Sequence, residues 1–309
     1  MHDQDHGKMA RTQSRLWIWA LAVVLVGAGA AVWVIRPQTL PHDALDGLTG
    51  VAMRGEQVFW AGGCASCHAA EGATGDARLA LGGGRRFETD FGTFVVPNIS
   101  TDPTHGIGSW SALDLANALH FGTSPKGQHY YPAFPYTAYS HMTLDDIVDL
   151  KAFLETLPAV TIPNSPHDLR FPFTLRAGLG AWKWLYSGQA WAVPDPLNGP
   201  AERGRYLAEA LAHCGECHTP RDALGGMQSA GWLTGAPNPT GKGRTPNITP
   251  SALSWSEDEI VEYLTTGFTP DYDSVGGHMT EVVENMAKLP PQDRAAIAAY
   301  LKAVPPAAP

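Results

Sequence analysis

The string Cys-x-x-Cys-His occurs twice in this chain, and it constrains the fold more than any other feature. The two copies are Cys64-Ala-Ser-Cys67-His68 and Cys214-Gly-Glu-Cys217-His218. Two thiols at this spacing can bond to the two vinyl groups of one porphyrin, and the histidine that follows can bind the iron. The sequence therefore predicts two covalently bound haem c groups, attached through all four cysteines, with His68 and His218 as proximal iron ligands.

Other uses of the four cysteines fit the pattern less well. Structural zinc motifs usually separate their cysteine pairs by roughly 15–20 residues, whereas about 150 residues separate the pairs here. A thioredoxin-like redox pair gives no reason for a histidine after both pairs. Because every cysteine lies in a motif, none remains for a disulfide framework.

The N-terminal region contains an apolar segment that predicts a membrane anchor. Residues 16–35 carry no charge, and 20 such residues are enough to cross a bilayer as a helix. Lys8, Arg11 and Arg15 precede this segment, which predicts that residues 1–15 are cytoplasmic. The haem-binding part is then periplasmic, tethered to a bacterial inner membrane by a single pass. Ala28-Gly29-Ala30 resembles a signal-peptide cleavage site, but signal cores span only roughly 7–15 residues, so we favour an uncleaved anchor.

Each haem motif belongs to a longer repeat, which predicts two domains. Three strings recur in the same order, namely Pro97-Asn98-Ile99 with Pro246-Asn247-Ile248, Ser109-Trp110-Ser111 with Ser254-Trp255-Ser256, and His141-Met142-Thr143 with His278-Met279-Thr280. We therefore expect a linker at 36–49, domain 1 at 50–159, an aromatic and proline-rich connector at 160–199, and domain 2 at 200–305.

The local patterns predict helices and long loops, hence an all-α fold. Helices are expected at 51–61, 112–120, 201–212 and 257–265, and a further helix closes each domain. Ser111 and Ser256 stand where N-caps belong, and Thr143 with Asp146 resembles a capping box. The glycine- and proline-rich stretches 72–109 and 219–250 show no strand alternation and are expected to be loops.

The distal ligand of each iron decides between electron transfer and substrate chemistry, because histidine–methionine ligation leaves no open position. Met142 is the only methionine between Met53 and Met227, and the repeat pairs it with Met279. We expect Met142 to bind the first iron and Met279 the second, with Met286 as an alternative. His141 and His278, directly before the two methionines, are the rival ligands.

Several other residues are candidates for the haem pockets. Asn98, Trp110, Asn247 and Trp255 carry N–H donors that suit haem propionates, although a turn and a packed core would use the same residues. Arg85 and Arg86 are further candidates for a propionate. The connector aromatics, which include Trp184, predict packing between the domains, or else contact with the membrane interface or a partner subunit.

Longer strings resemble a known family. Gly55-Glu56, Pro97-Asn-Ile-Ser-Thr-Asp102, Gly106-Ile-Gly-x-Trp110 and Tyr131-Pro-Ala-Phe-Pro-Tyr136 are similar to the multihaem cytochrome c subunits of membrane-bound alcohol, aldehyde and sugar dehydrogenases. Together with the repeat, the resemblance implies two tandem cytochrome c domains; the N-terminal transmembrane helix that precedes them here is a departure from the family pattern. The resemblance also implies an electron conduit from a dehydrogenase to a quinone, a soluble cytochrome or a terminal oxidase. The chain departs from the alcohol dehydrogenase subunits in having two motifs instead of three, and Phe134 stands where a methionine is common.

The leading hypothesis is therefore a membrane-tethered electron carrier without substrate turnover, working with a dehydrogenase or with a respiratory or photosynthetic complex. The net charge of −9 argues against nucleic acid as a partner. One alternative is a dihaem enzyme such as a peroxidase or thiosulfate dehydrogenase, which needs a labile distal ligand. Another is a structural haem subunit of an oxidase complex; an N-terminal tether before two haem domains also resembles the dihaem subunit of cbb3-type oxidases.

Overall fold

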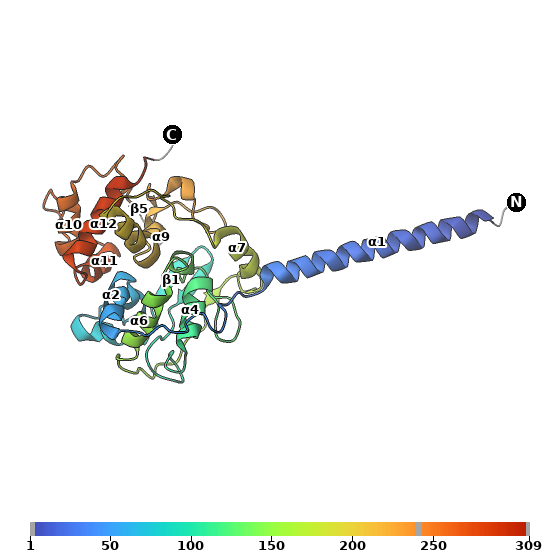
Figure 1. The fold of residues 1–309 in the computed structure, drawn as a ribbon, viewed down its shortest axis with the longest axis horizontal. Coiled ribbons are helices and arrows are strands. Elements are labelled where there is room, and N and C mark those ends of the chain that lie inside the picture. The colour runs from blue at the N-terminus through green and yellow to red at the C-terminus, as the bar shows by residue number, and fades with distance from the viewer. Residues whose placement is uncertain (1–3, 239–242, 307–309) are drawn as a thin grey trace.

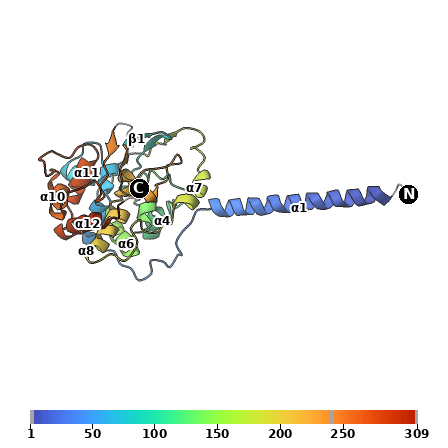
Figure 2. The same cartoon turned by 90° about the horizontal axis from the view of Figure 1, so that it is seen from above.

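The structure is a computed structural model that describes residues 4–238 and 243–306. A long helix, α1 (Gln4–Ile35), extends away from a globular body that contains the other elements (Figure 1, Figure 2). Its segment Trp17–Ile35 is long and apolar enough to cross a membrane, although a signal sequence near an N-terminus would have the same character.

The body consists of two helical halves and a connector. The elements of domain 1 are α2 (Ala52–Ala61), α3 (Cys64–His68), η1 (Gly75–Leu79), β1 (Arg86–Thr89), β2 (Gly92–Val95), α4 (Ala112–Phe121), α5 (Tyr136–Tyr139) and α6 (Leu144–Leu154). The connector contributes β3 (Asp168–Leu169) and α7 (Gly178–Tyr186). The elements of domain 2 are α8 (Pro200–Arg205), η2 (Tyr206–Leu211), α9 (Gly215–His218), η3 (Ser229–Gly231), β4 (Ala236–Pro237), β5 (Arg244–Thr245), α10 (Glu257–Thr266), α11 (Met279–Met286) and α12 (Pro291–Ala303).

The same helix pair forms the centre of each domain: α2 packs on α6, and α8 packs on α12. In each pair a glycine lets the two backbones touch. A Cβ atom on Gly55 would lie 1.9 Å from the carbonyl oxygen of Asp149, and one on Gly204 would lie 1.8 Å from that of Ala296. Asp149 and Ala296 are therefore equivalent positions, and this contact fixes the register in which the two domains correspond.

The contact at Gly204 predicts a large effect of adding one methyl group. We expect Gly204→Ala to push α8 away from α12 and to cost about 3 kcal/mol, the upper end of the usual overpacking penalty, because the obstacle is backbone. The midpoint of chemical unfolding, followed by circular dichroism, should fall markedly. Gly276→Ala is the matched control, because no atom of the described residues lies within 4 Å of its added Cβ. Equal midpoints for the two variants would contradict the close approach.

The helices predicted from the sequence are present, and their caps explain where two of them begin. Ser111 and Ser256 are the N-caps of α4 and α10, and each forms a complete capping box with an acidic residue three positions later. Thr143 caps α6 by accepting a hydrogen bond from the Asp146 N–H. The capping box at Thr143 is incomplete, because the Asp146 carboxylate accepts a hydrogen bond from Tyr206 of domain 2 and not from the Thr143 N–H.

The prediction of continuous loops at 72–109 and 219–250 was wrong in detail. The first stretch contains the antiparallel hairpin β1–β2, which β3 of the connector extends, and the second contains the pair β4–β5. Strands of two to four residues are too short to show an alternating pattern in the sequence. The fold remains mainly helical, so the predicted class is confirmed.

Candidate haem sites

Each Cys-x-x-Cys-His motif forms a short helical turn that follows a residue in the left-handed conformation. The residue before Cys64 is Gly63, with φ of 63°, and the residue before Cys214 is His213, with φ of 42°. Glycine adopts this conformation freely, whereas histidine does so rarely. The same backbone turn therefore presents both motifs, and the second one tolerates some strain.

The two motif histidines are held in the same way by a backbone carbonyl. The Nδ1 atom of His68 lies 2.8 Å from the Pro97 carbonyl oxygen, and that of His218 lies 2.8 Å from the Pro246 carbonyl oxygen. A carbonyl only accepts, so Nδ1 carries the proton and Nε2 keeps its lone pair for a metal. Burial lowers the pKa of His68 to about 4, and it also lowers that of His218, which keeps both rings neutral.

These residues fit covalent haem c. Three of the attachment thiols are half-buried, and burial raises the pKa of Cys64 to about 12 and that of Cys67 to about 11. Burial likewise raises the pKa of Cys214 to about 12. Neither histidine Nε2 has a hydrogen-bond partner among the described residues, so each remains available as an iron ligand. Bound haem supplies a one-electron redox centre at each motif.

The repeated Pro-Asn-Ile string acts through its proline carbonyl, a role that the sequence pattern does not predict. The Asn98 amide, which we expected at a propionate, donates to the Val160 and Ile162 carbonyls of the connector, at 2.6 and 2.9 Å. The side-chain oxygen of Asn247 accepts from the backbone N–H and hydroxyl of Thr249. Both asparagines thus shape the turn that carries the proline, while their contact with haem stays a prediction.

The remaining predicted pocket residues have mixed surroundings. Trp110 and Trp255 pack half-buried against the hydrophobic core, and neither indole N–H has a hydrogen-bond partner among the described residues. Their roles at a propionate stay predictions. Arg85 lies at the first motif, where its guanidinium donates to the Ser66 carbonyl, and it also pairs with Glu281 of domain 2 at 2.8 Å. Arg86 is exposed on β1.

The two methionine strings lie at different places in the fold, which corrects the repeat inferred from sequence. Met142 stands seven residues before Asp149, and Leu289 stands seven residues before Ala296, so these two positions correspond in the register set by Gly55 and Gly204. Both side chains are core residues, 4% and 3% exposed. Met142 precedes the final helix of its domain, whereas Met279 opens α11, one helix earlier.

The exposure and contacts of each side chain nevertheless separate the candidates for the distal iron ligand. Met53, the other methionine of domain 1, is 74% exposed on α2, so Met142 is the buried methionine of that domain. Met279 is half-buried, and Met286 lies two turns later on the same face of α11 and is 2% exposed. Of the rival histidines, His141 stacks on Trp191 of the connector at 4.1 Å and His278 is exposed.

Both haem motifs lie at the interface between the two domains. The third residue of each motif contacts the opposite domain: the Ser66 hydroxyl accepts from the Asn285 amide at 2.7 Å, and Glu216 accepts from the Thr137 hydroxyl at 3.3 Å. Asn285 is 1% exposed, and its side-chain oxygen accepts from Arg78 of domain 1. The contact is therefore reciprocal, with each motif serving as part of the other domain's docking surface.

A second set of contacts brings the attachment sites closer. His213, directly before the second motif, is half-buried against the ring of Tyr139, with centroids 5.6 Å apart. The Tyr139 hydroxyl donates to the Gly62 carbonyl just before the first motif, at 2.9 Å. The pKa of the Cys67 thiol is raised mainly by burial, and Cys217 of the other motif adds to the rise. These contacts place the two attachment sites side by side.

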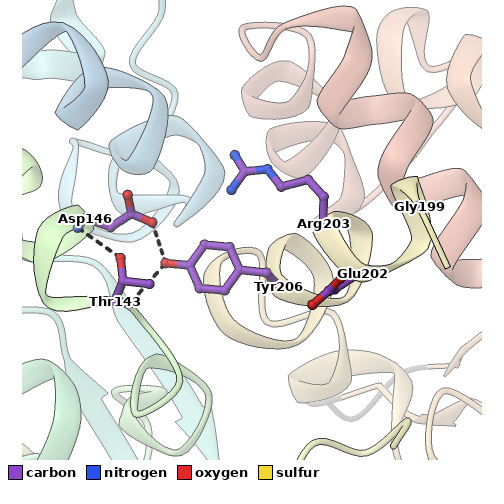
Figure 3. Close-up of a pocket in the computed structure, with 6 residues that line it drawn as sticks. All are labelled: Thr143, Asp146, Gly199, Glu202, Arg203 and Tyr206. Atoms are coloured by element: carbon purple, nitrogen blue, oxygen red, sulfur yellow. Dashed lines mark hydrogen bonds between the residues drawn. The ribbon is translucent and has the colours of Figure 1, made fainter. Parts of the chain in front are cut away.

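A tyrosine strengthens the interface away from the motifs (Figure 3). Tyr206 extends from domain 2 toward domain 1, where its hydroxyl donates to Asp146 and accepts from the backbone N–H of Thr143. Burial raises the pKa of Tyr206, and its hydrogen bond to Asp146 adds to the rise. The neighbouring Arg203 pairs instead with Asp293 of its own domain, at 3.0 Å. Tyr206 and its neighbours line a pocket between the domains, and none of the residues that line it belongs to a haem motif.

Two helical domains, each with a thioether-forming motif and a carbonyl-held histidine, define a dihaem protein with covalently attached haem c. The sequence model of the family described as cytochrome c matches residues 52–158 and 201–305. The chain belongs to the cytochrome c family.

Known relatives agree with this assignment. A protein named diheme cytochrome c-type from Cereibacter sphaeroides is 59% identical over 285 residues, which cover 92% of this chain and 96% of the relative. The fructose dehydrogenase cytochrome subunit of Gluconobacter japonicus is 37% identical, over 93% of this chain and 58% of its own length. The alcohol dehydrogenase (quinone) cytochrome c subunit of Gluconobacter oxydans is 34% identical, over 93% and 59%. The chain thus spans about three fifths of these dehydrogenase subunits.

Proposed function

We propose that this chain is a membrane-anchored electron carrier that passes single electrons through its two haem groups and has no substrate turnover of its own. In this proposal α1 spans the bacterial inner membrane, and both domains lie in the periplasm. The donor is a dehydrogenase or a respiratory or photosynthetic complex. The acceptor is a soluble cytochrome, a quinone or a terminal oxidase.

The observation that carries the proposal is that each haem motif contacts the opposite domain, the first through Ser66 and the second through Glu216. A carrier gains from two redox centres that are held side by side, because an electron that enters one domain can then leave from the other. The relatives that are named as cytochrome subunits of dehydrogenases support the same role. The apolar length of Trp17–Ile35 supports the anchor.

The proposal also assigns the iron ligands. His68 and His218 bind on the proximal side, and Met142 and Met279 bind on the distal side. The assignment of Met142 as a ligand rests on its burial in domain 1. The repeat does not support this assignment, since Met142 and Met279 do not occupy corresponding positions in the fold. Ligation on both sides of each iron leaves no position for a substrate, as a pure carrier requires.

Electron delivery to a one-electron acceptor tests this function directly. The fully reduced holoprotein in detergent, mixed in a stopped-flow instrument with excess oxidised soluble cytochrome c, should deliver two electrons per chain, and both haem spectra should become oxidised. The same preparation should consume neither peroxide nor thiosulfate catalytically. Delivery of a single electron, or sustained turnover of peroxide or thiosulfate, would contradict the role of a pure carrier and would favour a dihaem enzyme.

A further inference from the structure

The connector carries exposed apolar side chains beside the base of α1. Phe171, Leu175, Trp184 and Leu185 are 79%, 58%, 66% and 49% exposed, and we call this set the connector face. Trp184 and Leu185 project from the side of α7 that also exposes Ala177 and Ala181, at helical spacing. Four large apolar side chains this exposed within 15 residues of chain indicate a contact with a partner or a membrane.

The connector face lies on a rigid support. The Lys183 ammonium donates to the carbonyls of Phe121 and Gly122, at 2.6 and 2.7 Å, which pins one side of α7 to domain 1. The Trp182 indole N–H donates to the Leu224 carbonyl of domain 2 at 2.9 Å. Because these two side chains point into the body, the opposite side of α7 is turned outward.

The support is joined directly to the end of the apolar helix. A Cβ atom on Gly180 would lie 2.4 Å from the Cα of Ile35, so α7 touches the last residue of α1. The Ile35 carbonyl, which the helix leaves without an internal partner, lies 2.8 Å from the Nε2 of His129 in domain 1. Both views show α7 at the base of α1 (Figure 1, Figure 2).

The position of α7 relative to a bilayer follows from the length of α1. The 19 residues Trp17–Ile35 span about 28 Å as a helix, close to the roughly 30 Å of a hydrocarbon core. Ile35 then lies at the outer boundary of that core, and α7, in contact with it, lies at the level of the headgroups. Tryptophan is favoured at this depth, and Trp33 and Trp184 both stand there.

The charge around the connector face also suits a lipid surface. The chain has 30 acidic residues, yet none falls within residues 169–194. Of the three basic residues in this segment, Arg176 and Lys183 donate to carbonyls of domain 1, which leaves Arg170 as the exposed one. Arg170 is exposed next to Phe171. A connector segment that contributes no carboxylate of its own and carries an exposed cation beside Phe171 suits the boundary between acyl chains and anionic headgroups.

We propose that the connector face inserts into the outer leaflet of the membrane that α1 spans, as a second and interfacial contact. This inference rests on the proposed anchor. Its consequence is that the two haem domains do not swing on a flexible tether. They are held at the membrane in one orientation, fixed by α1 through Ile35 and by the connector face.

Spin labels placed on the full holoprotein test this proposal. The four native cysteines are consumed as thioethers, so a single added cysteine is the only thiol that reacts with the label. Trp184→Cys and Leu175→Cys would carry it on the connector face, with haem content checked first. The protein would be reconstituted in vesicles of phosphatidylcholine and phosphatidylglycerol, and the accessibility of each label to oxygen and to a water-soluble nickel complex would be measured.

Two control sites separate the possible outcomes. Met53→Cys labels an exposed apolar position on α2 and should read as aqueous, whereas Val26→Cys labels the middle of α1 and should read as buried in lipid. We expect the oxygen-to-nickel ratio at Trp184→Cys and Leu175→Cys to exceed that at Met53→Cys several-fold. If Val26→Cys reads as lipid and both connector labels read as aqueous, the proposal fails and the face serves a protein partner. If Val26→Cys itself reads as aqueous, the anchor fails and the proposal falls with it.

Discussion

Replacing Met279 with leucine is expected to remove the distal sulfur ligand of the second iron while leaving domain 2 folded. Met279 is half-buried at the first position of α11, so an apolar side chain of similar volume costs little there. Leucine has no atom that can bind iron. Loss of the thioether should make the second haem high-spin and should lower its reduction potential, because methionine ligation raises the potential.

The measurement is near-infrared magnetic circular dichroism of the oxidised holoprotein. Two sulfur-ligated irons give two sulfur-to-iron charge-transfer contributions, so Met279→Leu should retain about half of that intensity. Spectroelectrochemical titration should show one of the two midpoints falling, within the roughly 0.8 V range that axial ligands set.

Met286→Leu is the matched control for this experiment. Met286 lies two turns later on the same face of α11, but it is 2% exposed and packs in the core. Its replacement should leave the charge-transfer intensity and both potentials unchanged. If Met286→Leu removes the signal and Met279→Leu keeps it, the ligand assignment must be exchanged between the two residues.

The two covalently bound haem groups could be predicted from the sequence, because covalent attachment requires fixed residue types at a fixed spacing. The helices were accessible for a related reason: a serine cap and a periodic apolar face are local patterns, as α4 and α10 show. The carbonyl that holds each histidine could not be predicted from the sequence. Every residue has a backbone carbonyl, so the residue types at 97 and 246 do not indicate that Pro97 and Pro246 hold the histidines.

The interface between the domains could not be predicted for a different reason. The Asn285–Ser66 hydrogen bond joins residues 219 positions apart, and neither residue type is unusual for an exposed loop. The two His-Met-Thr strings suggested the wrong pairing of positions, because three identical residues do not establish that two segments are equivalent in the fold. The glycine contacts at Gly55 and Gly204 supply that reference, and they pair Met142 with Leu289 instead of Met279.

That pairing makes Met142→Leu an unusually clean test of the first iron. Domain 2 already has leucine at the corresponding position, 3% exposed and packed before its final helix, so the fold demonstrably accepts leucine there. A change in the spectrum would therefore report the lost sulfur and not a damaged core. Isosteric exchange of this kind usually costs less than about 1.5 kcal/mol.

If Met142 binds the first iron, Met142→Leu should remove the other half of the charge-transfer intensity, and the double variant with Met279→Leu should have none. Unfolding midpoints close to those of the unmodified protein would show that packing is intact. If instead the spectrum of Met142→Leu is unchanged, Met142 is a core residue like Leu289, and the first iron has no methionine ligand in domain 1. The first haem would then have a distal side that is open or bound by another residue, and the distinction between a carrier and an enzyme would depend on domain 1 alone.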